Sequence, residues 1–462
     1  MTALPLASLY SRAGRGGHTD GRGQRRHTSP TLRLCSIVLI KIIICPSGAK
    51  HQRRRQSPLL SHASTPFSSH TDHLFHPAGA AMKHMPWRDF FALVVSIGVV
   101  GLGLGATMPL TALTLHQRGV GTDIIGMITA VSALGILAAS PFVSRWVGRF
   151  GARATMLGAV WVASLATIAM QFTDHLLAWS VLRFLFGGAM GVLFTIGEAW
   201  VNRLAPDNSR GRVVAMYTTS FTFFQLIGPA LVALFNDKIS WSFAACGLLF
   251  LLAVPGLMLI SNSGPDREPE EHGVKWTLIL PRMPMIVLGA AFFALFDTLA
   301  LSLLPLYAME HGIGTDLALL SATVVLVGDT GLQFALGWMA DRFGRAKVHA
   351  GCGVAVCLLL PLLPFAVGTP WLWWTLLLLL GAAAGGIYML ALVACGERFT
   401  GLSLTSASAI VNATWGVTSG GGPLLTGVLM QSVGVNALPA VMWVCAAIFV
   451  GSAVWERRKG IV

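Results

Sequence analysis

The sequence predicts an all-α membrane protein in which twelve transmembrane helices form two six-helix halves. Three observations carry this prediction: a composition too apolar for a soluble domain, about twelve apolar segments long enough to cross a bilayer, and an internal repeat that relates the two halves. Of the 462 residues, 54% are hydrophobic and 11% are charged, whereas soluble domains carry about 25% charged residues.

The net charge of +13 is concentrated near the N-terminus. Residues 1–81 hold 11 Lys and Arg against 2 Asp and Glu, which leaves a net charge of only +4 for residues 82–462. The body of the chain therefore gives no support for a nucleic-acid partner. The apolar run at 34–45 is interrupted by Lys41 and is too short to span about 30 Å of hydrocarbon. We interpret residues 1–81 as a disordered extension, or as the product of a start codon placed too far upstream.

Apolar segments of membrane-spanning length recur from residue 90 onward, separated by short polar breaks. The predicted spans are 90–115, 124–144, 153–172, 176–200, 212–235, 240–261, 284–309, 317–339, 348–367, 371–396, 404–430 and 436–455. The longest polar break divides six spans from six. We therefore expect an N-terminal half at 82–261, a cytoplasmic central loop at 262–283, a C-terminal half at 284–455 and a cytoplasmic tail at 456–462.

Basic residues predict the orientation, because Lys and Arg near span ends favour the cytoplasm. Every second loop is basic: these loops and the two ends hold 18 Lys and Arg, against Arg118 and Lys238 in the alternate loops. Both termini are thus expected to be cytoplasmic.

The two halves align with each other at a nearly constant offset. The sequence GVGTD at 119–123 matches GIGTD at 312–316, and RFG at 149–151 matches 342–344, both 193 residues apart. Gly228-Pro229 matches Gly422-Pro423 at an offset of 194. Parallel six-span repeats are an architecture of secondary transporters, with the substrate site near the midplane between the halves.

The loop GWMADRFGRAK at 337–347 carries the most specific motif. With this architecture, it resembles the major facilitator superfamily, whose loop between the second and third helices of a half reads G-x-x-x-D-R-x-G-R-[RK]. The motif positions are filled by Gly337, Asp341, Arg342, Gly344 and Arg345, whereas the first-half copy has Ser144 for the glycine and Gly148 for the acid. The stretch RGRVVAMY at 210–217 and the glycine-proline run into GVLMQ are similar to the bacterial YcaD-like branch.

The resemblance implies a multi-pass protein of the bacterial inner membrane that works as a monomer. It also implies that the charged loop is a conformational latch, which holds the halves together on the cytoplasmic side in the outward-open state and breaks in the inward-open state. The alternative is that these charges only anchor a cytoplasmic loop. Glu397, next to Arg398 at a span end, is interpreted as an interface charge.

Ionisable residues inside spans are costly, so each is a functional candidate. Asp297 and Asp329 are both expected about 18 Å from the cytoplasmic end, near the midplane. Burial favours the protonated form of a carboxylate, which suits a group that binds and releases a proton during transport. The alternative is a structural role for either residue.

Arg183, in the fourth span, resembles the intramembrane arginine of the family and is a candidate for the substrate and proton-coupling cavity. Glu198 lies fifteen residues later on the same helix face, so both side chains could face one cavity. Glu198 is a third candidate for proton coupling.

The function expected from these observations is secondary active transport of a small organic solute or drug-like compound by alternating access, coupled to protons. An uncoupled facilitator, a sensor without flux and a membrane-embedded enzyme remain alternatives. No Walker motif, metal-ligand spacing or catalytic constellation is found, so neither cofactor, metal nor catalytic residue is predicted. Membrane lipid and a small-molecule substrate are the expected partners.

Overall fold

The computed structural model describes residues 87–204, 210–234, 241–260, 276–399 and 402–460. The predictions for residues 1–81 and for most of the central loop lie outside these ranges. Helices account for nearly all of the described chain, and no strand occurs in it.

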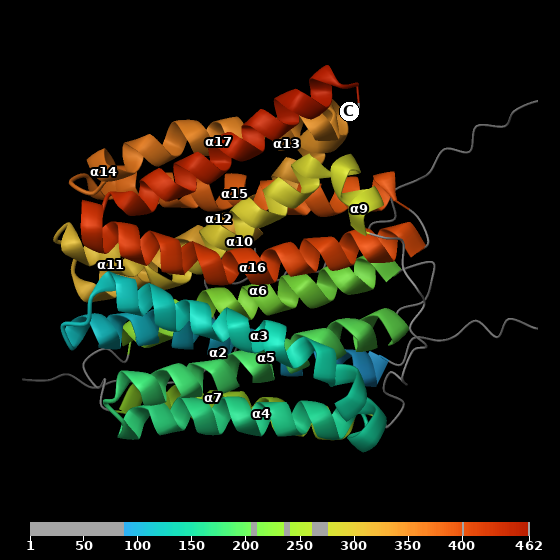
Figure 1. Ribbon diagram of the computed structural model, residues 1–462, viewed down its shortest axis with the longest axis vertical. Helices are drawn as coiled ribbons and strands as arrows, with labels where there is room; N and C mark the ends of the chain where they lie inside the picture. The colour runs from blue at the N-terminus through green and yellow to red at the C-terminus, as the bar shows by residue number, and fades with distance from the viewer. Residues whose placement is uncertain (1–86, 205–209, 235–240, 261–275, 400–401, 461–462) are drawn as a thin grey trace, which may run out of the picture. The chain divides into compact units, whose positions relative to one another are not determined.

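The helices form two sets that follow one another along the chain (Figure 1). The first bundle, residues 87–259, comprises α2 (Trp87–Gln117), α3 (Thr122–Phe150), α4 (Ala152–Ala169) with the 3₁₀ turn η1 (Met170–Phe172), α5 (Leu176–Leu204), α6 (Arg210–Leu234), α7 (Ser242–Leu251) and α8 (Ala253–Leu259). The second bundle, residues 276–458, comprises α9 (Trp276–Ile279), η3 (Leu280–Arg282), α10 (Pro284–Ser302), α11 (Leu304–Glu310), α12 (Thr315–Phe343), α13 (Arg345–Leu359), η4 (Leu360–Leu362), α14 (Leu363–Ala366), α15 (Pro370–Arg398), α16 (Leu402–Val433) and α17 (Ala437–Arg458).

Eleven of these helical segments are long and apolar enough to cross a membrane. The 32-residue α16 is the twelfth long helix. The all-α, twelve-helix prediction is therefore confirmed, and the chain is a multi-pass membrane protein.

Three spans predicted as continuous are interrupted in the structure. The span at 240–261 breaks between α7 and α8, that at 284–309 breaks between α10 and α11, and that at 348–367 passes through η4. Pro255, Pro305 and Pro361 lie just after these breaks or within them. Proline has no backbone N–H to donate to the carbonyl four residues earlier, which explains the interruptions.

The repeat seen in the sequence has a structural counterpart. Helices α3 and α12 begin and end at equivalent residues, 193 positions apart. Each ends at a glycine with positive φ, 82° at Gly151 and 97° at Gly344, and the next helix starts at once. L-residues with side chains rarely adopt this conformation, so the sharp reversal depends on glycine.

Contacts between α3 and α16 and between α6 and α12 join the two bundles. In Figure 1, α6 and α16 run through the middle of the view, with the other helices of each bundle on either side. Glycines allow the close approach of α3 to α16: a Cβ on Gly126 would meet the carbonyl of Pro423, and one on Gly427 would meet that of Thr122.

Candidate functional site

The latch motif lies where α12 turns into α13. Arg345 donates to Asp341 one turn earlier, at 3.3 Å between Nη2 and Oδ1. The same guanidinium binds Glu397 at the end of α15. Arg342 instead lies over the ring of Trp338, 5.3 Å from the ring centroid. Glu397 is thus a partner of the motif, which the sequence interpretation missed because 52 residues separate it from Arg345.

All the described ion-pair partners of this motif belong to the second bundle. That arrangement is the one expected when a latch between the halves is open. In the first bundle, Ser144 and Gly148 are exposed, and Arg149 lies over Phe150 at 5.3 Å. The latch itself remains a prediction.

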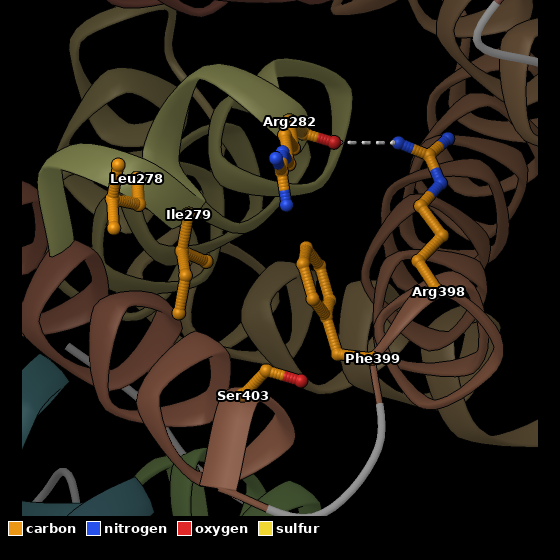
Figure 2. A pocket seen from close by; sticks show the side chains of 6 residues that line it. All are labelled: Leu278, Ile279, Arg282, Arg398, Phe399 and Ser403. Atoms are coloured by element: carbon orange, nitrogen blue, oxygen red, sulfur yellow. Dashed lines mark hydrogen bonds between the residues drawn. The ribbon is translucent and has the colours of Figure 1, made fainter. Parts of the chain in front are cut away.

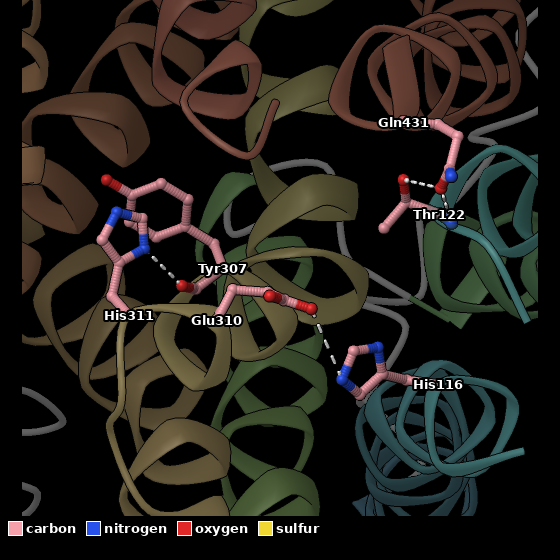
Figure 3. Close-up of polar contacts among 6 residues, drawn as sticks. All are labelled: His116, Thr122, Tyr307, Glu310, His311 and Gln431. Atoms are coloured by element: carbon pink, nitrogen blue, oxygen red, sulfur yellow. Dashed lines mark hydrogen bonds and ion pairs between the residues drawn. The ribbon is translucent and has the colours of Figure 1, made fainter. Parts of the chain in front are cut away.

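Polar contacts join the two bundles at the end opposite the 337–347 loop (Figure 3). The Nε2 atom of His116, at the end of α2, lies 3.7 Å from a carboxylate oxygen of Glu310 at the end of α11. The backbone N–H of Thr122 donates to Gln431 at 3.1 Å, and the Thr122 hydroxyl donates to the carbonyl of Gly427 at 3.0 Å. None of these cross-bundle contacts was anticipated from the sequence.

Polar side chains are exposed near the motif end of α3 and α16. Side chains of Ser140 and Ser144 on α3, and of Ser408 and Asn412 on α16, are exposed there. The backbones of α3 and α16 are in contact at the end opposite the 337–347 loop, and polar side chains are exposed at the loop end. This indicates a state in which the bundles are closed at the end opposite the loop.

Asp329 is enclosed within the second bundle. Its side chain is 5% exposed and accepts a hydrogen bond from Nε2 of Gln333 at 3.1 Å. A Cβ on Gly385 of α15 would overlap the Asp329 carboxylate, so the missing side chain at that glycine makes the space for the acid. Asp297 of α10 is half-buried and lies close enough to Asp329 for the charges of the two carboxylates to interact.

Both acids lie at similar depth, about 20 Å along the helix axis from the motif end of α10 or α12. The structure therefore brings together the two carboxylates that the sequence singled out separately.

Replacing Gly385 by alanine is expected to lower the free energy of unfolding by about 2 kcal/mol, because the added methyl group overpacks the Asp329 site. Gly396→Ala on the same helix is the matched control, since a Cβ there meets nothing within 4 Å. Thermal unfolding of the purified protein in detergent measures the difference. Equal midpoints for the two variants would show that Asp329 is not confined by α15.

Arg183 and Glu198 occupy different environments, although both lie on α5. Arg183 is 1% exposed, its guanidinium lies 4.9 Å from the ring centroid of Phe186, and its Nε and Nη2 atoms have no hydrogen-bond partner among the described residues. Glu198 is exposed. Fifteen residues place the two about 22 Å apart along the axis, so the structure does not bring them to one point.

Three aromatic rings that the sequence analysis did not single out meet beside the acids. Tyr388 of α15 stacks on Phe293 of α10, with centroids 4.9 Å apart and planes at 12°. Trp415 of α16 lies 5.2 Å from Tyr388 and 5.6 Å from Phe293. A tyrosine inside an apolar span, in a chain with four tyrosines, is the signal that could have found this cluster.

A buried ion pair stabilises the motif end of the second bundle. Glu456 of α17 is 0% exposed and binds Arg398 at 2.7 Å. Its other oxygen accepts the backbone N–H of Met285, in the first turn of α10, at 2.7 Å. Arg398 also donates to the carbonyl of Arg282 at 3.4 Å, across a pocket of about 310 Å³ (Figure 2). Helix α17 thus continues as ordered structure through the residue expected to begin the tail.

The family comparison decides what these elements form. The model of the Major Facilitator Superfamily matches residues 93–331 and 286–459. The chain belongs to the Major Facilitator Superfamily. It is 23% identical over 352 residues to the uncharacterized MFS-type transporter YfkF of Bacillus subtilis (strain 168), covering 74% of this chain and 89% of that protein.

Solved transporter structures share the fold. A D-xylose-proton symporter matches with a TM-score of 0.64 at 16% identity, over 79% of this chain and 96% of its own. A bacterial homologue of the human lysosomal transporter Spinster, in an inward-facing and occupied conformation, matches with a TM-score of 0.64 at 11% identity, over 81% and 97%. The resemblance found in the sequence is confirmed at the level of the superfamily, and the protein is a transporter that works by alternating access.

Proposed function

We propose that this MFS protein is a proton-coupled secondary transporter of a small organic solute or drug-like compound. The observation that carries the proposal is the pair Asp297 and Asp329, two carboxylates within Coulombic range of each other inside one bundle. Two neighbouring acids in a low-dielectric site disfavour the doubly ionised state, so a proton is retained until the surroundings change. Alternation between two bundle arrangements supplies such a change.

Asp297 is the better placed of the two to exchange the proton. It is half-buried, whereas Asp329 is enclosed and hydrogen-bonded to Gln333. In the proposed mechanism the negative charge of Asp329 favours protonation of Asp297. Asp297 is then the group that binds and releases the proton. We place the protein in the bacterial inner membrane as a monomer, with the 337–347 loop and both termini cytoplasmic, which makes the described state inward-facing.

The test is a substrate screen on purified protein in liposomes, with a pH gradient imposed or collapsed. Accumulation of a solute that requires the gradient supports the proposal. Movement that only equalises concentrations, at the same rate with and without the gradient, would identify an uncoupled facilitator instead.

Neutralising the latch acid should change the populations of the two states. Asp341→Asn removes one partner of Arg345 without changing shape, and the state closed at the motif end should be depleted. A cysteine introduced at Ser408 of α16, in a chain whose own cysteines are replaced, should then react faster with a water-soluble maleimide. Asp174→Asn, which removes a charge at the other end of the protein, is the control. Unchanged reactivity would indicate that the charges of the motif only anchor a cytoplasmic loop.

A further inference from the structure

The contact between His116 and Glu310 crosses from one bundle to the other at the end opposite the 337–347 loop (Figure 3). His116 lies in the last turn of α2, Glu310 is the last residue of α11, and Nε2 is 3.7 Å from the nearer carboxylate oxygen. That separation is longer than a hydrogen bond. A neutral imidazole therefore gains little from the contact, whereas a protonated one attracts the carboxylate through its charge. The strength of the contact depends on whether His116 carries a proton.

The pair joins the helices of the two bundles, because each partner is held firmly in its own bundle. The buried side chain of Tyr307, on α11, donates its hydroxyl to Asn436 of the second bundle at 3.2 Å. Helix α2 packs against α6 and α7 of the first bundle. If the bundles separate at this end, His116 must therefore move away from Glu310.

Two neighbouring ionisable side chains have partners within one bundle. Arg118, two residues beyond His116, pairs with Asp174 of the first bundle at 3.0 Å. His311, next to Glu310, places Nδ1 2.8 Å from the carbonyl oxygen of Tyr307 on its own helix. A change in the charge of His311 therefore acts within the second bundle.

The other charged groups near the pair are acids. Asp123 and Asp316 lie in the first turns of α3 and α12, and exposed carboxylates stay ionised above about pH 5. The described parts of α6 and α7 carry no charged residue at this end. Histidine is the side chain whose charge ordinarily changes between pH 5 and 8. Among the described groups that contact the other bundle here, His116 is therefore the one that responds to pH in that range.

We infer that His116 and Glu310 form a pH-sensitive gate at the end of the protein opposite the 337–347 loop. The arrangement in which the bundles meet at this end supplies the carboxylate partner, so it binds the proton of His116 more tightly, and acid populates it. The two side chains are 27% and 43% exposed, so the gate responds to the solution on its own side of the membrane. In the proposed orientation this is the periplasm. The gate goes beyond proton coupling, since it does not require Asp297 or Asp329 to titrate.

The experiment measures distances between two spin labels by double electron–electron resonance, on the full-length protein in detergent. Cysteines that replace Leu177 of α5 and Leu317 of α12, both exposed at this end, carry the labels in a chain whose own cysteines are replaced. Between pH 8 and pH 5.5, the ratio of the short-distance to the long-distance population should rise about threefold, as expected for a partly exposed ion pair.

His116→Gln and Glu310→Gln should each remove this rise, because either change leaves no ion pair to form. His175→Gln is the matched control, since it removes an exposed histidine at the same end of the first bundle and should keep the rise. Exchanging the partners, His116→Glu with Glu310→His, should restore it, because the charges are interchanged but the pair is retained.

A rise in His116→Gln as large as in the unmodified protein would overturn the inference and assign the pH response to other groups, such as Asp297 and Asp329. If one population is too small to measure, the series is repeated in Gly427→Ala. A Cβ at this position of α16 would meet the carbonyl of Thr122 in the other bundle, so the separated population increases. Equal ratios at the two pH values in that background would also overturn the gate.

Discussion

Asp297→Asn is expected to abolish accumulation driven by a pH gradient while leaving substrate exchange at equal pH intact. Asparagine preserves the size of the side chain but cannot bind and release a proton. Exchange cycles the loaded carrier without net proton release, so it does not need the titratable group. Counterflow and gradient-driven uptake, measured in the same proteoliposomes, separate the two activities.

Asp329→Asn provides the comparison within the pair. Its carboxylate is packed against Gly385 and accepts the Gln333 amide, so a structural role predicts that its loss weakens both activities together with the yield of folded protein. Asp174→Asn, at an exposed site, should retain both activities. Full gradient-driven accumulation in both single variants would reject coupling through these acids. Glu198 or an uncoupled facilitator would then be the better explanation.

The fold could be predicted because its determinants are local or periodic. Apolar length specifies a span, and the paired glycines Gly151 and Gly344 specify the same reversal in each half. Prolines were visible in the sequence, yet the breaks at α7, α11 and η4 were not anticipated, since proline is tolerated at many positions of a membrane helix. Whether a given proline breaks its helix depends on whether a neighbouring helix donates a hydrogen bond to the carbonyl that the proline leaves without a donor.

The site was predictable only in part. The sequence shows which charged residues are costly to place inside a span, but it does not show which residues they contact. A charge inside a span is expensive wherever it lies, which is why Asp297, Asp329 and Arg183 could be identified one by one. Pairing depends on how helices pack. Glu397 binds Arg345 across 52 residues, and His116 reaches Glu310 in the other bundle. The Tyr388 cluster lacks charge and lies in an apolar run, so the single phenol hydroxyl was the one feature that could have distinguished it from ordinary core.

Two arginine-carboxylate pairs near the end of α15 differ in burial, and their stabilities should differ accordingly. Glu397 and Arg345 are both about half exposed, with the glutamate side chain at 51%. Glu456 is 0% exposed, its partner Arg398 is 20% exposed, and it also accepts the N–H of Met285. Exposed pairs contribute about 0–1 kcal/mol, whereas removing one partner of a buried pair costs about 3–5 kcal/mol because the other charge is left unpaired.

Glu456→Ala is therefore expected to lower the free energy of unfolding by about 3 kcal/mol, toward the low end of that range because Arg398 reaches solvent. Glu397→Gln, which removes the neighbouring exposed acid, should cost less than about 1 kcal/mol. Apparent thermal midpoints of the purified full-length variants in detergent compare them directly. The double variant Glu456→Leu with Arg398→Leu should recover part of the loss, since no uncompensated charge remains in the bundle, although the Met285 N–H still lacks its acceptor. Equal shifts for Glu456→Ala and Glu397→Gln would mean that water reaches Glu456, and that α17 does not anchor the start of α10 through this carboxylate.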